Sequence, residues 1–143
     1  MQALNPYLLF DGNCAQALRF YQHTLGGELE AMMTYADAPD TADCENFAPG
    51  TSERIMHARL VLHGGAVLMA SDCPVGYPYD GMKGFHLSLT YATVAQAQHV
   101  FAALAENGNV IMPLQKTFWA EVFGMVVDRF GAPWMIAGDV VQG

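Results

Sequence analysis

Two short stretches of the chain carry side chains that could do chemistry, and in both the polar residues alternate with apolar ones. His57 and Arg59 lie two residues apart in "IMHARLVLH", and Glu121 lies between Trp119 and Phe123 in "WAEVF". A histidine can exchange protons or bind a metal, an arginine can bind a carboxylate or phosphate, and a carboxylate can act as a base. Alternation with a period of two is typical of a β-strand, so we expect each set to share one face of a sheet.

The elements that would position these residues form an internal repeat in the sequence. "AQALRFYQ" at 15–22 and "AQAQHVFA" at 95–102 both follow an apolar, strand-like run and lead into "GG" or "NG". "GAVLM" at 65–69 likewise resembles "GAPWM" at 131–135. The helices lie 80 positions apart and the hairpins 66, and an insertion of about 14 residues in the polar stretch 35–53 reconciles the two offsets. That insertion is either a solvated loop or a lid over a pocket.

The expected helices have recognisable ends. Asn13 is the predicted N-cap of a helix over 14–25, and Gly26 stands where a C-terminal glycine belongs. Thr93 with Gln96 forms a capping-box pattern before the second helix.

Each half therefore reads β-α-β-β-β, which places the fold in the α+β class. We expect one domain over 1–143, made of modules 1–72 and 84–143 and a linker at 73–83 that is dense in Gly, Pro and Tyr. The modules are predicted to form a curved, cup-like mixed sheet with the helices outside, in one chain or across a dimer.

Alternation assigns the two faces of that sheet. In "IMHARLVLH" the apolar positions 56, 58, 60 and 62 would face the helix. In "FHLSLTY" the apolar positions 85, 87, 89 and 91 would do the same. The opposite, cup-lining face would then hold Asn5, Tyr7, His57, Arg59, His86, Trp119 and Glu121.

Two long motifs resemble a known family. They are "NPYLLFDGNCAQALRFYQHTLGGEL" and "TFWAEVFGMVVDRFGAPWMI", and with the paired β-α-β-β-β order they cover nearly the whole chain. The chain resembles glyoxalase/bleomycin-resistance/dioxygenase proteins of the vicinal oxygen chelate superfamily. More closely, it resembles the PhnB-like subgroup, sometimes labelled demethylubiquinone methyltransferase-like. The resemblance implies this fold and a choice of functions that includes isomerases, dioxygenases, thiol transferases and plain drug binders.

The resemblance also implies where a metal would bind. Superfamily enzymes place His or Glu ligands on the first and last strand of each half, and the matching positions here are Asn5, Met69, His86 and Met135. A thioether is a poor ligand for a hard divalent cation, so we expect no catalytic metal and no cofactor. The alternative is a metal-dependent lyase, isomerase or dioxygenase, in which His57, His86 and Glu121 would converge on the ion.

Composition excludes several classes of partner. The chain has six Lys and Arg against 14 Asp and Glu, a net charge of −8, so nucleic acid is not an expected partner. No run is long and apolar enough to span a bilayer, and "MQALNPYLLF" does not resemble a signal peptide. Three cysteines without metal-type spacing favour a reduced, cytoplasmic protein. Methyltransfer has no support, because no glycine-rich loop opens a parallel βαβ unit.

We therefore predict a homodimeric protein that binds a small aromatic or anionic molecule. Arg59 would bind the anionic group, although an internal ion pair with Glu121 is equally compatible with the pattern. Glu121 is either a buried base with a raised pKa or a residue at the rim in water. Cys14, near a helix N-terminus, is a weaker candidate for a reactive thiolate. The expected ligand-binding residues are Asn5, Tyr7, His57, Arg59, Met69, His86, Trp119, Glu121, Phe123 and Met135.

Overall fold

The computed structural model describes residues 4–37 and 49–140. The chain divides into two compact units, Met1–Gly81 and Met82–Gly143. Residues 38–48, which make up much of the predicted insertion and include Cys44, lie outside the described residues.

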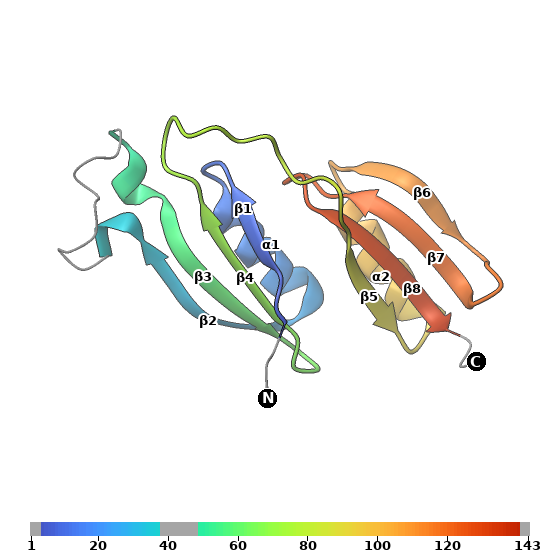
Figure 1. The fold of residues 1–143 in the computed structure, drawn as a ribbon. Coiled ribbons are helices and arrows are strands. Elements are labelled where there is room, and N and C mark those ends of the chain that lie inside the picture. Colours follow the sequence, from blue (N-terminus) through green and yellow to red (C-terminus); the bar gives the residue numbers. More distant parts are fainter. Residues whose placement is uncertain (1–3, 38–48, 141–143) are drawn as a thin grey trace. The chain divides into compact units, whose positions relative to one another are not determined.

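The first unit is a four-stranded sheet with one helix packed on it (Figure 1). The strands follow the order β1-β4-β3-β2, and only β1 and β4 run parallel. Short 3₁₀ turns, η1 (Tyr35–Asp37) and η3 (Thr51–Glu53), lie between β2 and β3. The regular elements are β1 (Tyr7–Phe10), α1 (Cys14–Leu25), β2 (Gly27–Thr34), β3 (Ile55–Leu62) and β4 (Val67–Asp72).

The second unit repeats this arrangement. Its sheet has the order β5-β8-β7-β6, again with only the first pair parallel. Its elements are β5 (Leu87–Tyr91), α2 (Val94–Ala105), β6 (Asn109–Gln115), β7 (Ala120–Val127) and β8 (Pro133–Val140). The predicted α+β fold of two β-α-β-β-β repeats is confirmed.

The two helices start in different ways. At α2 the predicted capping box is present: the Gln96 amide donates to the Thr93 hydroxyl at 3.2 Å, and the Thr93 amide donates to the Gln96 side chain at 3.3 Å. At α1 Asn13 is the N-cap residue, as predicted, but its side chain makes no capping hydrogen bond. A carboxylate from β4 takes that role instead, as described below.

The helix of the second unit packs very closely on its sheet. A Cβ added at Gly138 on β8 would lie 2.7 Å from the Ala97 side chain, and one at Gly124 on β7 would lie 2.8 Å from the Phe101 ring. Ala97 and Phe101 are buried residues of α2, so these glycines mark the helix-facing side of the sheet. Residues that alternate with Gly124, such as Phe123 and Met125, therefore lie on the opposite side, here called the open face.

No helix among the described residues is long and apolar enough to cross a membrane.

Candidate functional site

The open face of the first unit carries the predicted polar residues of β3. Ala58 and Leu60 are fully buried and form the helix-facing side, while His57 and Arg59, which alternate with them, are partly exposed. Strand register places Arg59 opposite Met69 of β4, and Met69 opposite Tyr7 of β1. The predicted alternation of β3 is confirmed, and Tyr7, Met69 and Arg59 form one row across the sheet.

Two polar pairs lie on this face. The Tyr7 hydroxyl and His57 Nδ1 are hydrogen-bonded at 3.1 Å, and their rings lie 5.8 Å apart. Arg59 Nε donates to Glu30 Oε1 at 3.0 Å. The ion-pair partner of Arg59 within its own unit is therefore Glu30 of β2.

The open face of the second unit is apolar. Phe123 and Ala137 are buried on it and, with Ala120, form a hydrophobic cluster. A row of methionines crosses the strands beside this cluster, Met112 of β6 opposite Met125 of β7, and Met125 opposite Met135 of β8.

Aromatic residues extend this apolar surface at the start of β7. The Trp119 ring meets Phe123 edge-on, with centroids 5.2 Å apart, and Phe118 packs on Trp119 at 4.8 Å. Trp119 is 38% exposed and Phe118 is 91% exposed. The surface thus combines rigid rings with adaptable thioethers, a composition suited to a small apolar ligand.

Glu121 and His86 are both exposed. Glu121 carries a side chain 46% exposed and lies 3.7 Å from the Lys116 ammonium. It is therefore a residue in water, and the alternative of a buried base does not hold. His86 lies in the exposed segment just before β5, while Asn5, at the corresponding place before β1, is half-buried.

The donor set at the four implied metal positions does not fit a hard cation. Met69 and Met135 occupy the last-strand positions with thioethers, and Asn5 offers a neutral amide, which leaves His86 as the only strong ligand of the four. Across residues 4–37 and 49–140, no three His, Cys, Asp or Glu side chains gather in a way that could hold a metal.

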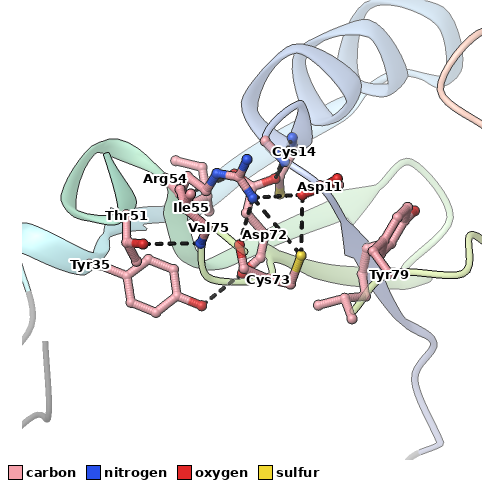
Figure 2. A network of polar contacts seen from close by, with 12 residues as sticks. Asp11, Cys14, Tyr35, Thr51, Arg54, Ile55, Asp72, Cys73, Val75 and Tyr79 are labelled. Atoms are coloured by element: carbon pink, nitrogen blue, oxygen red, sulfur yellow. Dashed lines mark hydrogen bonds and ion pairs between the residues drawn. The ribbon is translucent and has the colours of Figure 1, made fainter. Parts of the chain in front are cut away.

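A polar network that the sequence analysis missed lies at one end of the first unit (Figure 2). The Asp72 carboxylate, at the end of β4, is almost fully buried and accepts hydrogen bonds from the backbone amides of Gly12, Cys14 and Ile55. Asp72 thus caps α1 and ties it to β3. No sequence pattern marks this role, because Asp72 and Cys14 lie 58 positions apart.

An ion pair completes the network. Arg54 donates to Asp11 Oδ1 at 2.8 Å and to the Cys73 carbonyl at 2.9 Å. The hydrogen bond from Arg54 lowers the pKa of the Asp11 carboxyl. Burial raises the pKa of Cys73, and burial beside Asp72 raises the pKa of Cys14 to about 12. Both thiols stay protonated at neutral pH, so the candidate thiolate at Cys14 does not form.

The second unit has a comparable buried carboxylate. Asp128, after β7, accepts hydrogen bonds from the amides of Phe130 and Ala132 and from the Trp134 indole at 2.8 Å. An aspartate ahead of a turn with a glycine is a common local signal, and "DRFG" carries it. Asp72 and Asp128 are both engaged in hydrogen bonds that hold the backbone.

Comparison with known proteins places this geometry in a family. Residues 3–136 match the model of the Glyoxalase/Bleomycin resistance protein/Dioxygenase superfamily. Protein YjdN of Escherichia coli is 39% identical over 138 residues, 93% of this chain and 92% of that protein. Protein PA1353 of Pseudomonas aeruginosa is 47% identical, with a TM-score of 0.86 over 97% of this chain and 98% of that one. A PhnB protein of Bacillus cereus, described as a putative 3-demethylubiquinone-9 3-methyltransferase, is 25% identical, with a TM-score of 0.77 over 96% and 99%. The chain therefore belongs to the Glyoxalase/Bleomycin resistance protein/Dioxygenase superfamily and resembles PhnB proteins within it.

Proposed function

We propose that this protein binds a small aromatic or anionic molecule on the open faces of its sheets and does so without a catalytic metal. The observation that carries the proposal is the apolar surface of the second unit, where Trp119, Phe123 and the methionine row lie on the side of the sheet away from α2. A sheet face that served only as surface would carry polar side chains at these positions.

The rings and thioethers of this surface suit a planar apolar ligand. Trp119 and Phe123 meet edge-on, which leaves ring faces and edges for a third aromatic group. Met125 and Met135 are only partly buried and can repack around ligands of different shape. The second unit therefore selects by shape and polarisability.

The first unit supplies polar recognition. Arg59 is the one arginine of β3, and its side chain is 39% exposed on the open face, so a carboxylate can reach it. Tyr7 and His57 hold each other in place and offer a hydroxyl and an imidazole beside it. The proposed ligand-binding residues on this unit are Asn5, Tyr7, His57, Arg59 and Met69, and on the other His86, Trp119, Glu121, Phe123 and Met135.

A metal-independent role follows from donor chemistry. Neither Met69 nor Met135 can replace the imidazole or carboxylate that a divalent ion needs, and the exposed Glu121 is already paired with Lys116. The metal-dependent lyase, isomerase or dioxygenase is therefore the less favoured function. The methyltransferase description of the Bacillus cereus relative is a property of that protein, and the described residues of this chain contain no parallel βαβ unit opened by a glycine-rich loop.

We propose that the protein is a homodimer. Apolar side chains lie exposed on edge strands, with Leu9 of β1 43% exposed and Ile111 of β6 53% exposed. Covering such edges is a common reason for pairing. Sedimentation at micromolar concentration tests this, and a stable monomer would contradict it. A reduced environment such as the cytoplasm suits the two buried free thiols, Cys14 and Cys73.

The proposal is tested by a thermal-shift screen of aromatic and carboxylate metabolites, followed by tryptophan fluorescence. The chain has two tryptophans, and Trp134 is buried, so a bound aromatic compound should change the emission of Trp119. Trp119→Phe should abolish the emission change, and Trp119→Ala should weaken binding by about threefold to tenfold. Gln98→Ala, on the exposed side of α2, is the matched control and should bind normally.

Two results would contradict the proposal. One is a screen in which no compound raises the melting temperature. The other is a compound that binds equally well to the wild type and to the Trp119→Ala and Arg59→Met variants. The metal-free part is tested separately, by metal analysis and by repeating the titration after chelation. A stoichiometric divalent ion whose removal abolishes binding would overturn it.

A further inference from the structure

The ion pair on the open face of the first unit lies at an irregularity in β2. Leu29 lies opposite Leu60 and Ala31 lies opposite Arg59, so Glu30 is an extra residue between two paired positions. Such β-bulges re-aim a side chain, and they are frequent next to functional sites. The hydrogen bond from Arg59 Nε places the Glu30 carboxylate on the side of the sheet on which Arg59 lies.

The contact uses only one edge of the guanidinium. Glu30 Oε1 accepts from Arg59 Nε at 3.0 Å, and within the described part of the chain Arg59 has no other hydrogen-bond or ion-pair partner. The far end of the guanidinium, formed by Nη1 and Nη2, is a fork that matches the two oxygens of a carboxylate. Arg59 can therefore receive a ligand carboxylate end-on while it keeps its bond to Glu30.

We infer that Glu30 is a positioning residue that decides which anions Arg59 accepts, favouring monocarboxylates over doubly charged phosphate esters. Glu30 holds the guanidinium in place through Nε, and the negative charge of Glu30 balances the positive charge of Arg59. A monoanion then meets a neutral pair with an open fork, whereas a dianion meets the additional repulsion of Glu30. The inference rests on the proposed function, since it concerns the anionic ligand of the same face.

The test compares two probes that share one ring. Benzoate carries a single charge, and phenyl phosphate is a dianion at pH 8. Binding of each is followed by the NMR shift of the Arg59 Nε–H signal at low ionic strength, in the wild type and in Glu30→Gln. The matched control is Glu28→Gln, an exposed glutamate of the same strand that lies opposite Val61. Glu30→Asp keeps the negative charge at position 30. Arg59→Met removes the binding site, and the signal that disappears in this variant is thereby identified as that of Arg59 Nε–H.

The expected result is a change in selectivity. Glu30→Gln should raise the affinity for phenyl phosphate relative to benzoate by about threefold to tenfold, the range that one charge a few ångströms away produces at an exposed site. Glu28→Gln and Glu30→Asp should keep the wild-type ratio of the two affinities, because both variants keep the negative charge at position 30. An unchanged ratio in Glu30→Gln, with both probes bound at Arg59, would overturn the inference and leave the proposed function standing. If neither probe perturbs the Arg59 signal in any variant, the anionic part of the proposed function fails, and the inference fails with it.

Discussion

Replacing Asp72 by asparagine should destabilise the first unit strongly, although the two side chains have nearly the same shape. Asp72 is 1% exposed and accepts three backbone hydrogen bonds: Oδ1 from Gly12 at 2.8 Å and Cys14 at 3.0 Å, and Oδ2 from Ile55 at 2.9 Å. Figure 2 shows the carboxylate between the start of α1 and the start of β3. An asparagine can keep the two bonds at its oxygen, but its amide group would face the Ile55 N–H, donor against donor.

The expected cost has two parts. One buried amide left without an acceptor costs about 1–3 kcal/mol. Loss of negative charge at the N-terminus of α1 costs a further amount of about 0.3–1 kcal/mol. Asp72→Asn should therefore lower the free energy of unfolding by about 1–4 kcal/mol, and Asp72→Ala should cost more, because it leaves all three amides unpaired. Asp37→Asn is the control, since Asp37 is exposed and accepts one amide bond, from Thr34.

The assay must report on the first unit. Both tryptophans lie in the second unit, so fluorescence alone would miss the effect. Urea unfolding followed by far-UV circular dichroism gives the free energy, and amide hydrogen exchange at Cys14 and Ile55 locates the loss. The reasoning would be refuted by an Asp72→Asn variant within about 0.5 kcal/mol of the wild type and with unchanged exchange at both amides.

Two further predictions concern burial. The pKa of Cys14 is raised to about 12 in the folded protein. The protonated thiol therefore contributes fully to stability below the unfolded pKa of about 8.5, and this contribution is lost as the pH rises toward 12. The free energy of unfolding should fall by up to about 1.4 kcal/mol per pH unit in that window, and Cys14→Ala should lack this pH dependence. A pH profile identical in the two proteins would exclude it. Gly138→Ala should lower the free energy of unfolding by about 1–3 kcal/mol, because its Cβ would lie 2.7 Å from the Ala97 side chain. Urea unfolding followed by Trp134 emission measures this loss, and Ser88→Ala on β5 serves as the surface control. Equal unfolding midpoints for Gly138→Ala and the wild type would contradict the prediction and show that α2 can shift away.

Much of the fold could be predicted because the sequence repeats its local signals. Apolar alternation in β3 and the capping box at Thr93 and Gln96 depend on residues within a few positions of each other. The same pattern occurring twice, in the same order, indicated that both halves share one β-α-β-β-β order of elements. Side-chain alternation also put His57 and Arg59 on one face, since strand periodicity is a purely local property.

The polar partners could not be predicted, because they depend on register between distant strands. Glu30 of β2 meets Arg59 of β3 across a β-bulge, and no pattern in "GELEAMMT" indicates which residues of the two strands lie opposite each other. Asp72, and not the N-cap residue Asn13, supplies the side-chain hydrogen bond to the start of α1, because β4 ends beside the helix. Exposure of Glu121 likewise depends on where β7 starts relative to its neighbours, and its sequence position suits either of the two alternatives.

The most direct test of ligand binding on the open faces is a titration with benzoate, followed by NMR of methionine methyl groups labelled with ¹³C. Met125 and Met135 lie on the open face of the second unit and Met69 on that of the first, whereas Met56 alternates toward the helix-facing side of β3. Saturable shifts at Met69, Met125 or Met135, with Met56 unchanged, are the predicted result. Shifts confined to Met56, or no saturable shift at any methionine up to the solubility of benzoate, would contradict the account.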